Sequence, residues 1–214
     1  MFAHEERERI VEICLDLSRR GYLAGTGGNI ALRIDRELFA VTPSATDYFS
    51  MRAADVCVVR LSDLRQIEGE RAPSVETGLH ASVLRVRPDV RCSIHTHQPI
   101  ASAYALLNQP LDARDEQERH ILGPRIPVVG YMPSGSGLLT RLVRRALRRD
   151  VNAYLMRNHG VLCCGPTISQ TVRAVEALER LAEQRLIERI TQEANIHPAR
   201  SNAFRRLLAA MENS

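Results

Sequence analysis

Three histidines stand at positions from which their imidazoles could hold one metal ion. His95 and His97 are two residues apart in a predicted strand, and residues with this spacing project from the same face of a strand. By themselves, these two histidines are as consistent with a structural role as with metal binding. His159 precedes Gly160 in a predicted tight turn, where glycine lets the backbone approach closely and the imidazole can point into a cleft. Three histidines together predict an open zinc site with one position left for substrate or water.

A carboxylate close to such a site could act as an acid or a base, and Glu76 is the candidate. It lies near the start of a helix predicted over Val75–Val86. An acid in the first turn also interacts favourably with the helix dipole while Ser74 caps the helix, so position alone leaves both interpretations open. His80 shares a helix face with Glu76, and we interpret it as a packing residue or a hydrogen-bonded support rather than a fourth ligand.

The glycine-rich segment Gly25-Thr26-Gly27-Gly28-Asn29 is either a turn before a strand or a loop whose amides face an anion. It lacks the lysine of a phosphate-binding P-loop and precedes a strand instead of a helix, so nucleotide binding is not expected. All 29 basic residues of the chain are arginines. Without lysine the protein cannot form a Schiff base with a carbonyl substrate, so carbon–carbon bond chemistry would need a metal or another cofactor.

The elements that must position these residues follow from the hydrophobic pattern. Short strand-like runs separated by turns predict an antiparallel meander in the first third, and the rest predicts mixed helices and strands. Thr167 and Gln170 predict a capping box at the start of a long helix. The expected helices cover His4–Arg20, Val75–Val86, a stretch after Gln98, Leu138–Arg149 and a long segment after Thr167, and the expected strands cover Asn29–Ile34, Leu38–Val41, Val56–Leu61, Arg91–Thr96, Ala153–Met156 and Val161–Cys163.

Length and composition limit the kind of protein. The 214 residues contain no repeat and no linker-like stretch, which predicts one domain over 1–214 with its core at about 5–190. No apolar run approaches the roughly 18 residues that span a bilayer. The five cysteines form no C-x-x-C pair, so we expect a cytoplasmic protein. Acidic residues are interspersed with basic ones, so we expect no nucleic-acid and no membrane partner, and the arginines over 141–149 are interpreted as a solvated helix face.

Five motifs follow one another along the chain: Gly25-Thr26-Gly27-Gly28-Asn29, Thr42-Pro43-Ser44, Pro73-Ser74-Val75-Glu76, His95-Thr96-His97 and Asn158-His159-Gly160. In this order they resemble the class II aldolase and epimerase family, which includes fuculose-phosphate aldolase, ribulose-phosphate 4-epimerase and the head region of adducin. The resemblance covers about residues 5–190.

The resemblance implies an α/β fold, a three-layer αβα sandwich around a mostly antiparallel mixed sheet, and a homotetramer with active sites at subunit interfaces. It implies that the three histidines bind one divalent ion per chain, Zn²⁺ first and Mn²⁺ or Co²⁺ as alternatives. Glu76 matches the family's acid/base carboxylate. The residues that match positions holding the substrate's phosphate are Gly28, Asn29, Ser44 and Ser74.

The implied reaction is cleavage of a carbon–carbon bond of a small sugar, a sugar phosphate or a related hydroxy-keto acid through a metal-stabilised enediolate. Decarboxylation, dehydration and epimerisation use the same kind of metal site and are alternatives. A non-catalytic interaction module like the adducin head is an alternative of another class, and metal content discriminates it from the enzyme. Ala45 and Val75 stand where phosphate-sugar aldolases tend to have glycine and a second serine, so a phosphorylated substrate stays open.

Two regions complete the expectations. The family's tyrosine from a neighbouring subunit has no clear match in Ala113–Gly123, although Tyr131 could line the cleft. The last residues, Asn195–Ser214, either form a short helix that docks on a neighbouring subunit through Phe204, Leu207 and Leu208 or are disordered.

Overall fold

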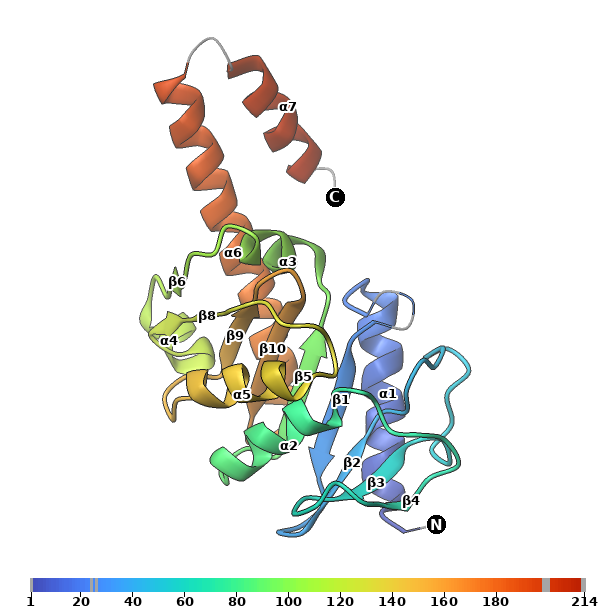
Figure 1. Cartoon of the computed structure of the whole chain (residues 1–214). Helices are drawn as coiled ribbons and strands as arrows, with labels where there is room; N and C mark the ends of the chain where they lie inside the picture. The colour runs from blue at the N-terminus through green and yellow to red at the C-terminus, as the bar shows by residue number, and fades with distance from the viewer. Residues whose placement is uncertain (1, 24, 26, 198–200, 213–214) are drawn as a thin grey trace.

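Most strands join one eight-stranded sheet with helices on both faces (Figure 1). The computed structural model describes residues 2–23, 25, 27–197 and 201–212. Its helices are α1 (His4–Arg19), α2 (Thr77–Val86), α3 (Pro99–Ala105), α4 (Glu116–Leu122), α5 (Gly137–Ala146), α6 (Ile168–Ile196) and α7 (Ser201–Glu212). Its strands are β1 (Asn29–Arg33), β2 (Leu38–Val41), β3 (Cys57–Arg60), β4 (Gln66–Glu68), β5 (Cys92–Thr96), β6 (Leu111–Asp112), β7 (Arg125–Ile126), β8 (Val128–Val129), β9 (Ala153–Met156) and β10 (Gly160–Gly165).

The strands of the large sheet lie in the order β4-β3-β2-β1-β5-β10-β9-β8, and β6 pairs with β7 apart from it. Every neighbouring pair in the large sheet is antiparallel except β8 with β9, which is parallel. The first four strands form the predicted meander, because strands that are consecutive in the chain are also neighbours in the sheet and antiparallel. The predicted mixed, mostly antiparallel sheet is therefore confirmed.

Two hydrophobic clusters lie on opposite faces of the sheet. Side chains alternate along β1, so Ile30 and Leu32 belong to one cluster and Ala31 to the other. The first cluster includes buried residues of α1, α3 and α6, and the second includes buried residues of α2 and α5. Burial of these apolar side chains is the main force that holds helices onto a sheet. The result is the three-layer αβα sandwich that the sequence predicted.

Two expectations next to the site are wrong. β5 ends at Thr96 as predicted, but His97, which was expected to project from this strand, lies just beyond it. α2 begins at Thr77, two residues later than expected, and Glu76 is its N-cap residue without a capping hydrogen bond from its side chain. The Ser74 hydroxyl accepts a hydrogen bond from the Glu76 amide at 3.2 Å. This bond occupies the Glu76 amide, and the carboxylate points elsewhere.

Other parts of the middle region also differ from the expectation. α5 ends at Ala146, so Arg148 and Arg149 lie beyond the helix that was to carry them as a face. The short elements β4, β6, β7, β8 and α4 were not predicted, because two or three paired residues and a two-turn helix leave too little periodicity to detect.

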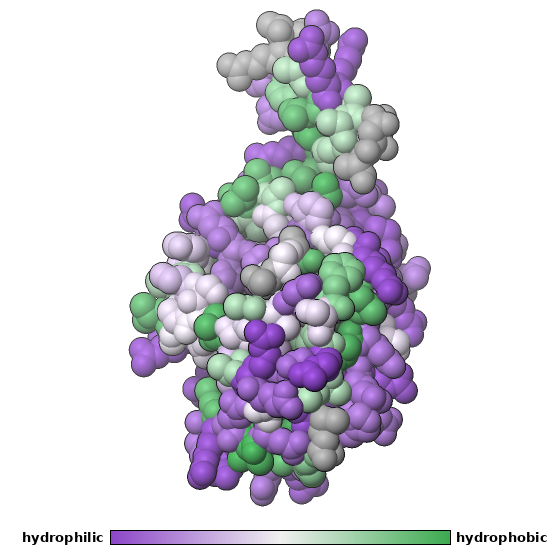
Figure 2. All heavy atoms as spheres, turned by 90° about the vertical axis from the view of Figure 1, so that its right-hand side faces the viewer, coloured by the Kyte–Doolittle hydropathy of each residue, from purple (hydrophilic) through white to green (hydrophobic). Residues whose placement is uncertain are grey.

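α6 begins with the predicted cap. The Thr167 hydroxyl oxygen accepts a hydrogen bond from the Gln170 amide at 3.2 Å and donates to the Gln170 side-chain oxygen at 2.8 Å. The helix is buried as far as Ala182, and its remaining turns project from the body with α7 beside them (Figure 1). Figure 2 shows a hydrophobic surface at the base of this projection, where it joins a body whose visible surface is mostly polar. The tail is thus helical over 201–212, and its docking on a neighbouring subunit stays a prediction.

Within the described residues, no helix combines the length and the apolar character that crossing a membrane requires.

Candidate metal centre

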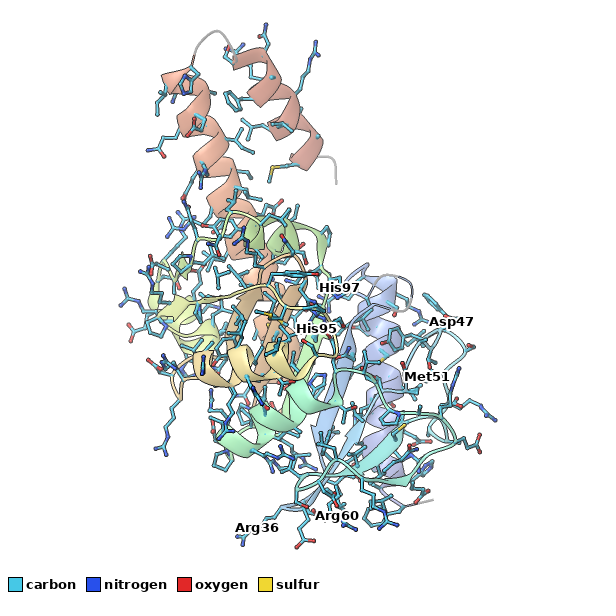
Figure 3. All side chains as sticks on the ribbon, viewed as in Figure 1. Arg36, Asp47, Met51, Arg60, His95 and His97 are labelled. Carbon is cyan, nitrogen blue, oxygen red and sulfur yellow. The ribbon has the colours of Figure 1, made fainter. Side chains whose placement is uncertain are left out.

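Three imidazoles converge at one end of the sheet. His95 lies in β5 and is fully buried, His97 follows that strand, and His159 lies in the turn between β9 and β10. The candidate ligand atoms of the three side chains all lie within 4.8 Å of one another. Figure 3 shows His95 and His97 together, at the end of the sheet opposite Arg36 and Arg60. The convergence that the spacing predicted is therefore present, although His97 reaches it from outside the strand.

The hydrogen bonding of His95 leaves one ring nitrogen free to bind a metal. Its Nδ1 donates to the Val161 carbonyl oxygen at 2.7 Å, so in the neutral ring Nε2 carries the lone pair. This Nε2 lies 3.0 Å from the Nε2 of His97. The buried Nε2 of His159 has no hydrogen bond of acceptable geometry within the described part of the chain. Buried lone pairs that face one another repel unless a proton or cation lies between them, so the three side chains fit a divalent ion.

The Glu76 carboxylate lies against the imidazoles, and only 4% of the residue is exposed. Its Oε1 lies 2.8 Å from His159 Nε2, but the contact is not aligned as a hydrogen bond, and its Oε2 lies 3.3 Å from His95 Nε2. Asn29 Nδ2 donates to Oε2 and Ser134 Oγ donates to Oε1, each at 2.8 Å. Each carboxylate oxygen therefore meets one imidazole nitrogen and one neutral donor.

The protonation states suit a metal ligand set beside a base. Burial lowers the pKa of His95 to about 3, against the attraction of Glu76, and burial also lowers the pKa of His97. For Glu76, burial acts to raise the pKa, but His159, His95 and the two neutral donors outweigh burial and hold this pKa well below its usual range. At neutral pH the site thus presents neutral imidazoles at His95 and His97 and an ionised carboxylate at Glu76, which metal binding and proton abstraction both need.

A buried chain of hydrogen bonds supports Glu76 from behind. His80 on α2 is fully buried, and its Nε2 lies 2.6 Å from Asn29 Oδ1 while its Nδ1 lies 2.8 Å from Ser93 Oγ. Because Asn29 Oδ1 can only accept, His80 Nε2 carries the proton, and the Asn29 amide nitrogen is left to face Glu76. His80 is the hydrogen-bonded support that its position on the helix suggested.

Two glycines let the backbone approach the imidazoles. A Cβ on Gly28, which has φ of +81°, would lie 2.7 Å from the His95 carbonyl oxygen and would overlap Leu23. A Cβ on Gly160, which has φ of +152°, would overlap the Thr96 carbonyl oxygen and lie 3.1 Å from His95 Cε1. Both conformations also disfavour residues with side chains. Glycine is therefore required on both sides of β5 for the rings to meet.

The residues expected to hold substrate surround one pocket beside the imidazoles. Its volume is about 120 Å³, and its lining includes Gly28, Asn29, Ser44, Ser74, Glu76 and His97. None of the described residues that line it is an arginine, so an anion there would meet hydroxyls and backbone amides. Ala45 also lines the pocket, with φ of +47°, a conformation that costs less for glycine. Thr26 of the glycine-rich segment lies outside the described residues.

Sequence reasoning missed Ser134 and misjudged Tyr131. Ser134 lies in the loop between β8 and α5, within a Ser-Gly-Ser stretch typical of any turn. Nothing local relates it to Glu76, from which it is separated by 58 positions. Tyr131 is 51% exposed and does not line the pocket, so the expectation that it would is wrong.

A larger hollow, of about 570 Å³, shares no residue with this pocket. Its lining includes Gly165, which pairs with Cys92 at the end of β5 away from His95. Its buried arginine, Arg87, donates to Asp89, to Asn152 and to two backbone carbonyls, so its donors are used within the protein. The smaller pocket is the one lined by a histidine of the cluster, His97, and by the buried carboxylate of Glu76.

The chain is similar to known proteins over most of its length. Residues 8–186 match the family model of the Class II Aldolase and Adducin N-terminal domain. The chain is 32% identical over 185 residues to a 5-deoxy-D-ribulose 1-phosphate aldolase of Bacillus thuringiensis serovar kurstaki, covering 86% of this chain and 85% of the relative. It is 28% identical over 192 residues to a methylthioribulose-1-phosphate dehydratase of Yersinia enterocolitica, covering 85% and 91%. A solved L-fuculose 1-phosphate aldolase superposes with a TM-score of 0.79 at 26% identity, covering 87% of this chain and 89% of that chain.

Proposed function

Because the chain belongs to the class II aldolase and adducin N-terminal domain family, we propose that it is a divalent-metal-dependent lyase that cleaves a carbon–carbon bond of a ketose 1-phosphate or related small sugar. The observation that carries this proposal is a buried carboxylate, Glu76, whose two oxygens lie 2.8 Å and 3.3 Å from imidazole nitrogens of a three-histidine cluster. Two relatives, an aldolase and a dehydratase, are each named for a substrate that is a ketose 1-phosphate, which supports this substrate class.

His95, His97 and His159 would hold the ion, Zn²⁺ first and Mn²⁺ or Co²⁺ as alternatives. A bound divalent ion supplies a Lewis acid that draws electron density from a substrate carbonyl oxygen. The His95 Nδ1 bond to Val161 keeps the other ring nitrogen turned toward the ligand position. A three-histidine set also leaves room in a tetrahedral site for substrate.

Glu76 moves the proton in this proposal. In the direction of condensation, its carboxylate takes a proton from C3 of dihydroxyacetone phosphate, which then bonds to the aldehyde. In the direction of cleavage, ionised Glu76 takes the proton of the C4 hydroxyl, directly or through water, and the C4 oxygen becomes the aldehyde carbonyl as the C3–C4 bond breaks. The electron pair of that bond stays on C3, and the protonated Glu76 returns the proton there. Asn29 has a second role in this proposal. Its amide nitrogen orients Glu76, and the residue also lines the pocket with Ser44 and Ser74, which would hold the phosphate.

We also propose that the protein is a homotetramer with its active sites at subunit interfaces. Val75 lines the pocket yet is 66% exposed, and apolar side chains exposed beside a polar pocket are typical of surfaces that another subunit covers. A neighbouring chain could then complete the substrate site that the small pocket leaves open.

Metal analysis followed by product analysis tests the proposal. Elemental analysis of the purified protein is expected to give about one zinc or similar ion per chain, as one three-histidine site holds one ion. The loaded protein is then incubated with 5-deoxyribulose 1-phosphate and with fuculose 1-phosphate, and dihydroxyacetone phosphate is measured by enzymatic reduction. Absence of metal even after reconstitution would instead favour the interaction module of the adducin type.

Dehydration is the second candidate, favoured by the similarity to methylthioribulose-1-phosphate dehydratase over 91% of that relative. A dehydratase removes a hydroxyl as water and leaves the carbon chain intact, whereas an aldolase releases two shorter products. Mass spectrometry of the products from methylthioribulose 1-phosphate separates the two reactions. A dehydrated product without any three-carbon fragment would replace the aldolase with the dehydratase.

A further inference from the structure

The loop between β8 and α5 brings Ser134 to the outer side of the Glu76 carboxylate, where its Oγ donates to Oε1 at 2.8 Å. We propose that Ser134 is a positioning residue that fixes the orientation of this carboxylate for proton transfer. This role rests on the proposed function, because it matters only if Glu76 transfers the proton.

Ser134 matters because the two oxygens of the Glu76 carboxylate are held by different donors. Asn29 holds Oε2, and the buried chain through His80 holds Asn29 in turn. Apart from the imidazole of His159, Ser134 is the donor to Oε1 among the described residues. The terminal torsion of a glutamate is broad, so one fixed oxygen leaves the carboxylate free to rotate about that contact. Two fixed oxygens define its plane.

Because Ser134 is exposed, its hydroxyl is needed to orient the Glu76 carboxylate and not merely to give that carboxylate a hydrogen bond. The Glu76 residue is 4% exposed, whereas Ser134 is an exposed residue at the mouth of the pocket. If the hydroxyl is removed, a water molecule can enter from solvent and bond to Oε1 almost as well. That water would satisfy the oxygen without fixing its direction. Loss of Ser134 should therefore affect the rate of proton transfer more than the stability of the protein.

The loop is held against the segment that carries Glu76 by a close approach of Gly135. Gly135 has φ of +70°, and a Cβ there would lie 3.1 Å from Val75 Cβ and 3.3 Å from the Val75 carbonyl oxygen. A residue with a side chain at this position would strain the backbone, and its Cβ would push the loop away from Val75. The backbone of Gly135 thus sets where Ser134 reaches, which provides a second way to break the same contact.

The first experiment replaces the hydroxyl. Ser134→Ala is expected to lower kcat about tenfold, the equivalent of about 1.4 kcal/mol, with KM within about twofold, because the substrate contacts remain while the acid/base group is misoriented. Exchange of solvent deuterium into dihydroxyacetone phosphate should fall in parallel, since it reports proton transfer directly. Zinc content should not change, and Ser134→Thr, which keeps the hydroxyl, should recover most of kcat.

Two controls come from the same loop. Ser136 caps α5 by accepting from the Leu139 amide, so Ser136→Ala should lower the unfolding midpoint with kcat within about twofold of wild type. Gly135→Ala should reproduce the effect of Ser134→Ala on kcat, whereas Gly137→Ala should not, because a Cβ at Gly137 meets no described atom within 4 Å. Equal losses of kcat in Ser134→Ala and Ser136→Ala would overturn the positioning role in favour of general loop integrity.

A crystal structure of zinc-loaded Ser134→Ala separates this inference from the proposed function. A carboxylate of Glu76 that is rotated or disordered, with the histidines in place, supports the positioning role even if wild-type protein cleaves none of the sugar phosphates. An unmoved carboxylate, or a kcat equal to that of wild type in an active enzyme, overturns it.

Discussion

At the scale of single residues, Glu76 illustrates how a local interpretation changes when distant contacts become visible. Its place at a helix start is compatible with a simple interaction with the helix dipole, and the residue is indeed the N-cap of α2. Its carboxylate nevertheless makes no capping bond and faces His95, His159, Asn29 and Ser134 instead. An ionised carboxylate removed from water and held by this many groups is typical of a functional site.

Glu76→Gln should therefore keep the metal and lose activity. The amide oxygen can still accept from Asn29 while the amide nitrogen donates to the Ser134 hydroxyl oxygen, but the amide cannot take up a proton, so kcat should fall by about 10²–10⁴-fold, the usual contribution of general acid–base catalysis. Steady-state kinetics with zinc analysis on the same sample checks this. A variant that retains full activity would contradict the role of Glu76.

His95→Ala should lower the bound metal from about one ion per chain to nearly none, because a site with two imidazoles loses most of its affinity. His120→Ala is the matched control, since His120 is an exposed histidine on α4 that lies outside the cluster. Elemental analysis of both variants after dialysis provides the measurement. Equal metal content in the two variants would mean that the ion binds elsewhere.

At the scale of elements, the site depends on how closely three strands approach one another. β5 carries His95 between β1 and β10, and the glycines at 28 and 160 occupy the points where a side chain would collide with the backbone of β5 or its continuation. Behind them, His80 joins α2 to both β1 and β5. The position of each ligand is therefore set by sheet pairing and by one helix packed on it.

Gly160→Ala should destabilise the protein by about 1–3 kcal/mol, the cost of a strained backbone, and should also reduce metal binding because the new Cβ collides beside His95. Gly21→Ala separates the two effects, since Gly21 has φ of +74° but open space around a Cβ. Urea unfolding and metal titration of both variants are the measurements. If Gly160→Ala loses no more metal affinity than Gly21→Ala, steric approach is not what sets the site.

His80 should make stability depend on pH. Burial lowers its pKa in the folded protein to about 4, below the value of about 6.5 in an unfolded chain. Between these values the unfolded state binds the additional proton, so stability decreases as the pH falls from 6.5 toward 4. From pH 7 to pH 4.5, His80 should remove about 2 kcal/mol of the free energy of unfolding. Urea titrations of wild type and His80→Gln across this range check it, and parallel curves would contradict the assignment.

At the scale of the whole molecule, the projecting pair formed by α6 and α7 and the exposed Val75 are surfaces that an assembly would cover. Among the described residues, neither α7 nor Val75 contributes to the two hydrophobic clusters of one chain. They bear on the substrate site as well, because Val75 lines the pocket and a subunit covering it would add residues to the lining.

Light scattering should give the mass of four copies of the 24.0 kDa chain. Removal of residues 197–214 should leave the metal site intact but shift the mass toward smaller species if the helical projection contributes to the interface. A monomeric wild-type protein with full lyase activity would contradict a site that needs its neighbour. An unchanged mass after truncation would place the interface elsewhere on the body.

The sequence alone determined the meander and the helix pattern, because these depend on residue types and spacings within about 20 positions. It also determined the histidine set and the order of motifs, because each motif is a short run of residues and their order can be seen along the chain. Only the tertiary structure decided which neutral groups hold Glu76 and how close the strands come at Gly28 and Gly160. The contacts of Glu76 with Asn29 and with Ser134 span 47 and 58 positions, and that of His80 with Asn29 spans 51. Such contacts follow from packing on the sheet, and no local periodicity records them.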